Sequence, residues 1–141
     1  MKTMRILIFV SIIALTTIST FAQSISDYPT QNISTDSNVA YRLFATKNMY
    51  TFIKLNTKNG QMRQVQWSAK GNEFETPLSL VTRVTKEDEK NGRFFLYPTT
   101  NIYNFILLDQ IDGRVWQVQW STEFTERMVI PILSFMTSMD S

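Results

Sequence analysis

Cysteine and histidine are absent from this chain of 141 residues, and glycine and proline occur only four times each. Without cysteine, no disulfide can hold the fold together, and thiolate chemistry and zinc–sulfur sites are excluded. Without histidine, the commonest general base and metal ligand is missing. The fold must therefore be held by its hydrophobic core and its backbone hydrogen bonds, and any acid–base chemistry must use carboxylates, lysine or tyrosine.

The N-terminus has the three parts of a secretory signal peptide. Lys2 and Arg5 precede an apolar run over residues 6–15, and small residues surround Ala22. The run is too short for a membrane-spanning helix, which needs about 20 predominantly apolar residues. We expect an exported protein, periplasmic or extracellular. Its expected parts are a signal peptide (1–22), a flexible polar leader (23–40) and a single β domain (41–141).

Removal of the signal peptide changes the charge balance. The whole chain has 14 Lys and Arg against 12 Asp and Glu, and Lys2 and Arg5 leave with the signal, so 12 basic and 12 acidic residues remain. A neutral domain lacks the basic surface expected of a nucleic-acid-binding protein. We therefore expect no nucleic-acid partner.

The sequence contains an internal repeat. When residues 43–68 are laid over residues 96–121 without a gap, 13 of the 26 positions are identical. The longest shared run is QVQWS, which ends at Ser68 and at Ser121. An ungapped match of this kind indicates that one structural unit occurs twice. The two repeats are expected at about 41–85 and 93–135.

Each repeat has the signature of a β-hairpin. The apolar runs MYTFIKLN and IYNFILLD are followed by the turn sequences TKNG and QIDG, and then by a second apolar run. Asn-Gly and Asp-Gly between such runs are strong hairpin signals, and Gly60 and Gly113 are free to adopt positive φ. Asn56 and Asp109, before each turn, can accept hydrogen bonds from loop amides.

The QVQW segment is predicted to be a strand with one apolar side. Because side chains alternate along a strand, Val118 and Trp120 point to one face. The Gln residues of both copies, Gln64, Gln66, Gln117 and Gln119, point to the other face and should be largely exposed. The ungapped identity predicts two halves in a pseudo-twofold arrangement, with Trp67 and Trp120 in equivalent buried positions.

Further strand-like segments flank each hairpin. The runs YRLFAT and RFFLYPT precede the hairpins, and segments 77–85 and 127–135 follow them. The β-branched content of the two later segments favours strands over helices, which are the alternative there, and Pro131 favours an edge or broken strand. The sequence thus predicts an all-β fold of two antiparallel meanders, each of three to four strands, that form a small sandwich or barrel. Residues 86–92 are the expected solvated connection.

The sequence leaves the hairpin register open between two alternatives. Loops of four residues, with Asp109 opposite Arg114, place the aromatic residues of the first strand on the Trp side and Lys54 opposite Arg63. Loops of three residues with a bulged Gly place those aromatic residues beside the Gln residues. A shift of one residue moves every side chain to the other face.

The pattern T-x-N-x-Y-x-F-I-x-L-[ND]-x-x-x-G-x-x-x-Q-V-Q-W-S, at 46–68 and 99–121, resembles a group of small exported bacterial proteins, chiefly of the Bacteroides type. These have no established activity, so the resemblance implies no functional residues. The hairpin alone is similar to hairpins of propeller blades that carry an L-D-x-x-T-G-x-x-x-W motif. A period near 50 lies in the propeller range. Two blades cannot close a ring, so a propeller would require several chains.

The second register predicts a binding surface of rings and amides. Rings can stack on the C–H faces of sugars while amides bond to hydroxyls, and aromatic residues also anchor protein interfaces. The alternative is that these aromatic residues form the core, because so small a domain must bury most of its large apolar groups. The candidate ligand-binding residues are Tyr50, Phe52, Gln64, Gln66, Tyr103, Phe105, Gln117 and Gln119.

Signals for catalysis are weak. Glu73 and Glu75 follow the first hairpin, and Glu123 and Glu126 follow the second, so a glycosidase-like pair of carboxylates is available. Neighbouring acids are more often solvated loop charges, since a catalytic acid needs a raised pKa. The sequence has no Gly-rich phosphate loop and no dense calcium loop, so no cofactor and no metal are expected.

These observations together predict a non-catalytic binding or interaction module. Its partner would be a glycan or a protein at the cell envelope or outside the cell. The alternative is a structural, self-assembling envelope protein whose sheets pair through exposed edges, which would make it a homo-oligomer. A carboxylate-based hydrolase is the third possibility.

The signal-peptide prediction can be checked directly. Because small residues surround Ala22, cleavage should follow that residue, and N-terminal sequencing of exported protein should begin at or near Gln23. Recovery of chains that retain Met1 in a membrane fraction would contradict the prediction.

Overall fold

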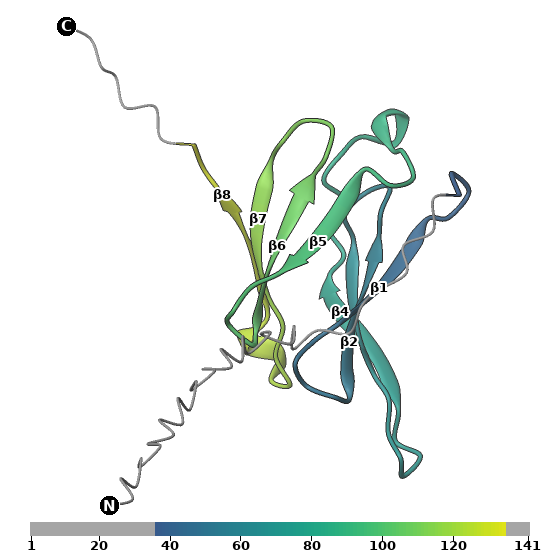
Figure 1. The fold of residues 1–141 in the computed structure, drawn as a ribbon, viewed down its shortest axis with the longest axis vertical. Helices are drawn as coiled ribbons and strands as arrows, with labels where there is room; N and C mark the ends of the chain where they lie inside the picture. The colour runs from purple at the N-terminus through teal and green to yellow at the C-terminus, as the bar shows by residue number, and fades with distance from the viewer. Residues whose placement is uncertain (1–35, 135–141) are drawn as a thin grey trace, which may run out of the picture.

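The computed structural model describes residues 36–134, which form two four-stranded antiparallel sheets (Figure 1). The first sheet has the order β1–β2–β3–β4 and the second has the order β5–β6–β7–β8. The strands are β1 (Tyr41–Ala45), β2 (Thr51–Asn56), β3 (Met62–Gln66), β4 (Phe74–Ser79), β5 (Phe94–Pro98), β6 (Asn104–Asp109), β7 (Val115–Gln119) and β8 (Met128–Ile132). Short 3-10 helices, η1 (Lys86–Asp88) and η2 (Phe124–Glu126), lie in connections. The predicted all-β fold of two meanders is confirmed, as two packed sheets rather than a closed barrel.

The two sheets repeat each other strand for strand. The first three strands of each sheet have bounds that differ by 53 positions throughout, as the duplication predicts. The fourth strands differ from expectation in detail. β4 starts at Phe74 and ends at Ser79, so the expected strand over 77–85 is wrong beyond its first three residues. A bulge at Met62/Arg63 shifts the pairing of β4 with β3, so β4 and β8 are not strictly equivalent.

Both fourth strands lie at sheet edges. Pro77 pairs with Arg63, and Pro131 pairs with Trp116, at the same place in the two sheets. A proline cannot donate a ladder hydrogen bond, so its place at an edge agrees with its chemistry. The prediction that Pro131 marks an edge strand is confirmed.

The hairpin register is the one with four-residue loops. The amide of Asp109 donates to the carbonyl of Arg114 at 2.9 Å, and the amide of Gly113 donates to the carbonyl of Asp109 at 2.8 Å. In the first repeat Lys54 lies opposite Arg63. The alternative with three-residue loops is therefore wrong. Gly60 and Gly113 have φ of 81° and 75°, as their turns require.

The repeated residues Thr46/Thr99 and Asn48/Asn101 build the turn between the first two strands. In the first repeat the hydroxyl of Thr46 donates to the carbonyl of Thr51 at 2.8 Å, and the amide of Tyr50 donates to Asn48 Oδ1 at 2.9 Å. The second repeat has the same two bonds at 2.7 and 2.9 Å. Threonine and asparagine side chains thus replace backbone partners in both turns.

The Trp of each QVQW segment fixes the same turn from the third strand. Trp67 Nε1 donates to the carbonyl of Met49 at 2.7 Å, and Trp120 Nε1 donates to the carbonyl of Ile102 at 2.9 Å. Each indole also packs against a tyrosine ring, with centroids 5.0 Å apart in the first repeat and 5.2 Å in the second. Repetition of the Trp is therefore explained by local structure within each hairpin.

Each sheet has two faces, which we name by the QVQW segment. The Trp face carries the Val and Trp side chains, and the Gln face carries the two Gln side chains. Cross-strand partners share a face. On the first sheet the Trp face holds Leu43, Phe52, Lys54, Arg63, Val65 and Trp67, and the Gln face holds Phe44, Ile53, Leu55, Met62 and Gln64. On the second sheet the Trp face holds Phe94, Leu96, Phe105, Leu107, Trp116, Val118 and Trp120, and the Gln face holds Tyr97, Ile106, Leu108, Val115, Gln117, Ile130 and Ile132.

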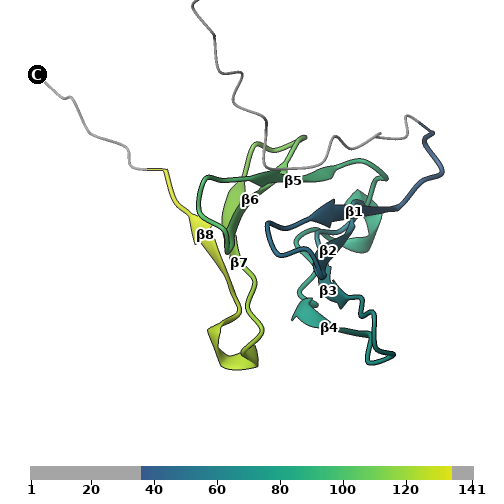
Figure 2. The ribbon, with the colours of Figure 1, turned by 60° about the horizontal axis from the view of Figure 1, so that its bottom comes forward.

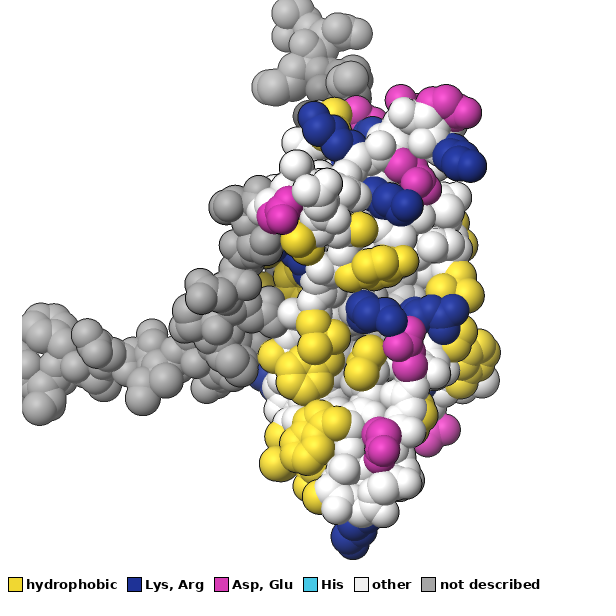
Figure 3. Space-filling view, turned by 90° about the vertical axis from the view of Figure 1, so that its right-hand side faces the viewer, with side chains coloured by type: hydrophobic (Ala, Val, Ile, Leu, Met, Phe, Trp, Pro, Cys, Tyr) yellow, Lys and Arg dark blue, Asp and Glu magenta, His cyan; other side chains and the backbone are white. Residues whose placement is uncertain are grey.

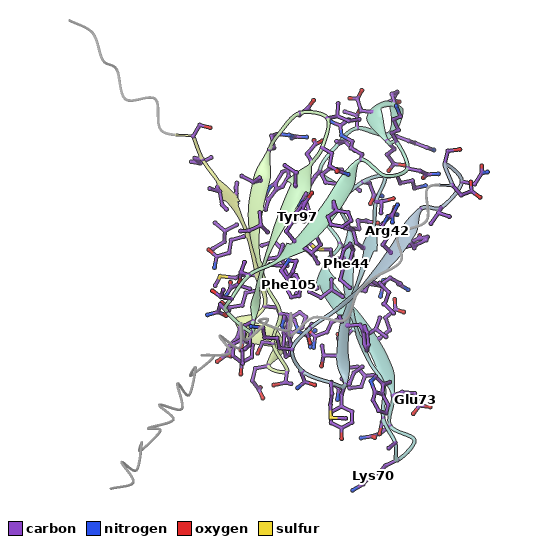
Figure 4. The ribbon with its side chains drawn as sticks, in the orientation of Figure 1. Arg42, Phe44, Lys70, Glu73, Tyr97 and Phe105 are labelled. Atoms are coloured by element: carbon purple, nitrogen blue, oxygen red, sulfur yellow. The ribbon has the colours of Figure 1, made fainter. Side chains whose placement is uncertain are left out.

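The two sheets meet through opposite faces. The first sheet turns its Gln face inward, so that Ile53, Leu55 and Met62 are fully buried. The second sheet turns its Trp face inward, and there Phe105 and Trp120 are buried. Figure 4 shows Phe44 and Phe105 between the sheets, while Lys70 and Glu73 lie at the tip of the β3–β4 hairpin. The core is thus built from one face of each kind.

This packing corrects the predicted pseudo-twofold arrangement. A twofold axis would bring like faces together, whereas here unlike faces meet. The two sheets lie side by side (Figure 2), with β5 in contact with β2 and β8 in contact with β4. Lys47, in the first turn of repeat one, donates to the carbonyl of Thr100, in the equivalent turn of repeat two, at 3.1 Å. Trp67 is consequently 42% exposed while Trp120 is 2% exposed. The two tryptophans have the same local contacts but not the same burial.

Several predictions from the sequence concern residues outside the described range. The signal peptide (1–22), leader residues 23–35 and the chain from residue 135 onward belong to this group. The end of the leader is described and is held in place, because Thr57 donates both its amide and its hydroxyl to the carbonyl of Ala40 at 2.7 Å. Within residues 36–134, none of the helices is long and apolar enough to cross a membrane.

The unequal burial of the two tryptophans predicts unequal stability losses. Trp120→Ala should lower the free energy of unfolding by about 3–5 kcal/mol, as for a large core aromatic residue. Trp67→Ala should cost only about 1–2 kcal/mol, the value of a partly exposed ring contact and one hydrogen bond. Urea denaturation of both variants measures the difference. Equal losses would show that the sheets do not pack through opposite faces.

Candidate binding surfaces

The structure divides the eight candidate ligand-binding residues between the core and the surface. Gln64 is fully buried and Phe105 is 1% exposed, because both point between the sheets. The expectation that Gln64 is exposed is therefore wrong, and so is the placement of Phe105 beside Gln117. The physical reason is the same for both residues: each lies on the face that its own sheet turns inward.

The four Gln side chains have different surroundings despite their repetition. Gln117 Nε2 donates to Asn104 Oδ1 at 2.8 Å, and Gln119 Nε2 donates to the carbonyl of Glu126 at 2.9 Å. Both are half-buried, and so is Gln66. Gln64 finds no hydrogen-bond partner among the described residues, since Thr51 stands where Asn104 stands in the second repeat. The predicted set of equivalent exposed amides is not formed.

The aromatic candidates are engaged by their own hairpins. Tyr50 is 41% exposed and Tyr103 is 45% exposed, but each ring lies against the Trp of its own repeat. Phe52 is half-buried on the outer Trp face of the first sheet. The structure therefore does not bring the eight residues together into one surface.

The outer Gln face of the second sheet is a broad apolar surface that the sequence analysis missed. Tyr97, Ile130 and Ile132 are each more than 40% exposed there. Between them lie the half-buried side chains of Ile106, Leu108 and Val115. A signal for this surface was present, because NFILLD carries Phe105 and Leu107 on one face and two further aliphatic residues on the other. A strand that is apolar on both faces requires cover on both.

The outer Trp face of the first sheet is mixed. Figure 3 shows this side of the molecule, with hydrophobic side chains above and below a group of basic and acidic ones. On this face Lys54 and Arg63 lie 2.7 and 3.4 Å from the carboxylate of Glu75. Tyr41 and Leu43 are about half exposed beside them, at 58% and 48%. A hollow of about 270 Å³ lies here, between Tyr41, Lys54, Arg63 and Leu80.

A cluster of arginine and aspartate side chains lies between the connecting segment and the second sheet. Asp109 is fully buried and accepts hydrogen bonds from Arg93 through both carboxylate oxygens, at 3.0 Å each. Arg114 donates to Asp109 at 3.0 Å, and Arg93 also binds Asp112 at 2.8 Å. The amides of Ile111 and Asp112 donate to Asp109 Oδ1. The expectation that Asp109 serves its turn is confirmed.

Two opposed effects act on the pKa of Asp109. Burial raises it, but hydrogen bonds from Arg93, then Arg114, and then the turn amides lower it more, so that the pKa falls to about 2. The same bond raises the pKa of Arg93. The pair is therefore fully ionised at neutral pH and acts as a structural bond.

The neighbouring hollow of about 570 Å³ is lined by Arg83, Arg93 and Arg114, among other residues. Each of these cations already has protein partners. Arg83 donates to the carbonyls of Gly60 and Val81, both at 2.8 Å, and Arg114 donates to the carbonyl of Arg83 at 3.0 Å. Burial lowers the pKa of Arg83 to about 10, which leaves it cationic at neutral pH. The cluster thus fastens the connection between the sheets, and of the Arg83 guanidinium only Nε has no partner among the described residues.

The remaining acidic candidates are also engaged or solvated. Glu75 is paired with Lys54, and Glu126 accepts a hydrogen bond from the hydroxyl of Ser121 at 3.2 Å. Glu73 and Glu123 lie on exposed loops. Across residues 36–134, no group of three or more Asp or Glu side chains is arranged to hold a metal ion.

Comparison of the chain with protein-family models, with curated proteins and with solved structures found no match.

The depressed pKa of Asp109 predicts a specific response to acid. Because its folded-state pKa of about 2 lies below the unfolded value near 3.9, its ionisation stabilises the fold above about pH 4. That contribution is lost as the pH falls towards 2. Asp109→Asn should lower the melting temperature at pH 7 by roughly 5 °C or more. The difference in stability between wild type and variant should shrink between pH 5 and 2. A difference that stays constant over this range would contradict the assignment.

Proposed function

We propose that this protein is an exported binding protein that acts without catalysis. Its recognition surface is the outer Gln face of the second sheet. The observation that carries the proposal is the row of aliphatic and aromatic side chains that this face leaves uncovered, including Tyr97, Ile130 and Ile132.

The extent of this surface supports a role in binding. Single exposed hydrophobic residues are common on soluble proteins, but a contiguous apolar patch marks an interaction site. Here the register places Ile130 beside Gln117 and Ile106, and Ile132 beside Val115 and Leu108. These side chains are neighbours across three strands of a rigid sheet, so they form one continuous patch.

The chemistry of the patch favours a protein partner over a glycan. Sugar recognition uses exposed ring faces together with amides free to bond to hydroxyls. On this face the side chains are mainly aliphatic, and the amide of Gln117 is already bonded to Asn104. Isoleucine, leucine and valine offer apolar area without polar specificity, which suits the apolar centre of a protein interface.

A matched pair of substitutions tests the proposal. Ile130→Lys places a charge on the patch, on its edge strand β8, and Ile111→Lys makes the same change at a similarly exposed residue in the β6–β7 turn (56% against 48%). Immobilised wild type and both variants are each incubated with an envelope protein fraction and, separately, with an envelope polysaccharide fraction. Wild type and Ile111→Lys should retain protein, and Ile130→Lys should retain about tenfold less, because an unpaired charge would be buried in the interface.

Thermal melts of the three proteins provide the folding control. Both substitutions replace exposed side chains, so both variants should melt within a few degrees of wild type. Equal retention of protein by Ile130→Lys and wild type would contradict the proposal. Retention of polysaccharide alone would show that the function lies with a glycan instead.

A further inference from the structure

We propose that the partner on this surface is a second copy of the same chain. The outer Gln face of the second sheet in one copy packs on the outer Trp face of the first sheet in the next. The contact between chains then repeats the contact that already joins the two sheets within each chain. This inference rests on the proposed function, since it names the occupant of the same surface.

Each chain covers only two of its four sheet faces in its own core. Its core contains the Gln face of the first sheet and the Trp face of the second. One Trp face and most of one Gln face are left outside, since Phe95 on that Gln face packs against Phe44 of the first sheet, with ring centroids 5.2 Å apart. These two faces belong to sheets whose first three strands have the same lengths and equivalent registers as the packed ones. A pair that matches the internal pair is therefore available only between two chains.

Most positions of the free Trp face carry the same residue type as the equivalent positions of the packed Trp face. Its members Leu43, Phe52 and Val65 stand at the positions of the buried residues Leu96, Phe105 and Val118. Tyr41 stands at the position of Phe94, which is also fully buried. A face with these side chains at these positions has the shape that the core of the chain accepts.

The free Gln face likewise matches the packed Gln face. Ile106 and Leu108 stand at the positions of Ile53 and Leu55, and Val115 stands at the position of Met62. The three residues of the first sheet are fully buried, whereas those of the second are only half-buried. Cover by another sheet would complete their burial and supply the hydrophobic stabilisation that the single chain lacks there.

Two positions of the free Trp face are charged, and this agrees with its exposure before assembly. Lys54 stands where Leu107 stands in the core, and Arg63 stands where Trp116 stands. Both cations are paired with Glu75, which reduces the cost of covering them. The hollow of about 270 Å³ beside them leaves space for side chains of the second copy. The face between chains is thus a more polar version of the internal one.

Contacts inside the chain identify which residues should meet between chains. The carbonyl of Thr57 accepts a hydrogen bond from the amide of Phe94 at 2.8 Å, at the junction of the two sheets. The positions equivalent to Thr57 and Phe94 are Gln110 and, in the first sheet, Tyr41. Both of these side chains are exposed in the single chain. Gln110 of one copy should therefore lie beside Tyr41 of the next.

The resulting contact joins unlike faces, so every added copy presents the same free face again. Contacts of this type close into a ring when the rotation allows it. Rings of four-stranded meanders packed face to face form propellers, which contain about four to eight sheets. With two sheets in each chain, a closed ring would contain two, three or four copies.

Cross-linking between two single-cysteine variants tests the polarity of the contact. The chain has no native cysteine, so Tyr41→Cys and Gln110→Cys each carry one thiol. Each variant, purified as the cell processes it, is treated with a short bis-maleimide alone and in an equimolar mixture. The mixture should yield a cross-linked dimer, and neither variant alone should do so. A cross-linked dimer formed by each variant alone would overturn the proposal in favour of a twofold contact.

Light scattering after size exclusion provides the second measurement. Wild type should form one species of two, three or four copies that survives dilution, as a closed ring does. Ile130→Lys should raise the concentration at which half of the protein is assembled by about tenfold or more, because it places an unpaired charge in the contact. Wild type that is monomeric over the whole accessible concentration range would overturn the inference.

The two proposals can fail separately. Pure protein contains no other partner, so a monomeric wild type removes the second copy as occupant. If Ile130→Lys still loses retention of envelope protein in that case, the binding function stands with a different partner. If neither assembly nor retention responds to Ile130→Lys, both proposals fall.

Discussion

The packing of a Gln face against a Trp face is the interaction on which the rest of the structure depends. It buries Trp120 and leaves Trp67 half exposed, although both indoles make the same bond within their hairpins. It also places Gln64 in the core without a partner among the described residues. Because each sheet contributes a different face to the core, the two outer surfaces of the molecule are also different. A twofold arrangement would have left two like surfaces.

Local structure and packing place separate demands on this sequence. Turn bonds from Thr and Asn, the glycine at positive φ and the indole bond are the same in both repeats. These contacts depend on neighbours within one hairpin, and they form whichever face of the sheet is covered. Packing acts on other positions, where the repeats have diverged. Asp109 and Arg93 illustrate this, since their buried ion pair has no counterpart at Asn56 and Ala40.

Most of the local structure could be predicted from the sequence, and the packing could not. The hairpins, the turn roles of Asn56 and Asp109, and the edge position of Pro131 follow from short-range rules. The identity between the repeats indicates that both have the same local fold, but the burial of a residue depends on which face meets the other sheet. Alternation along a strand shows which residues share a face, and it does not show which face is buried when both faces are apolar. Lys54 and Arg63, at the positions of Leu107 and Trp116, were the signal that the Trp face of the first repeat lies outside.

The similarity of the two repeats affects how the chain reaches its fold. All strands pair with chain neighbours, so each meander can form early from contacts of short sequence separation. Docking of the two meanders is then the step at which an error can occur, because two Trp faces of similar shape could meet in a kinetic trap. Such a misdocked state would leave the apolar side chains Ile53, Leu55 and Met62 on the Gln face of the first sheet uncovered. The correct docking covers the more apolar face of that sheet, and this difference in buried apolar area discriminates against the wrong partner face during folding.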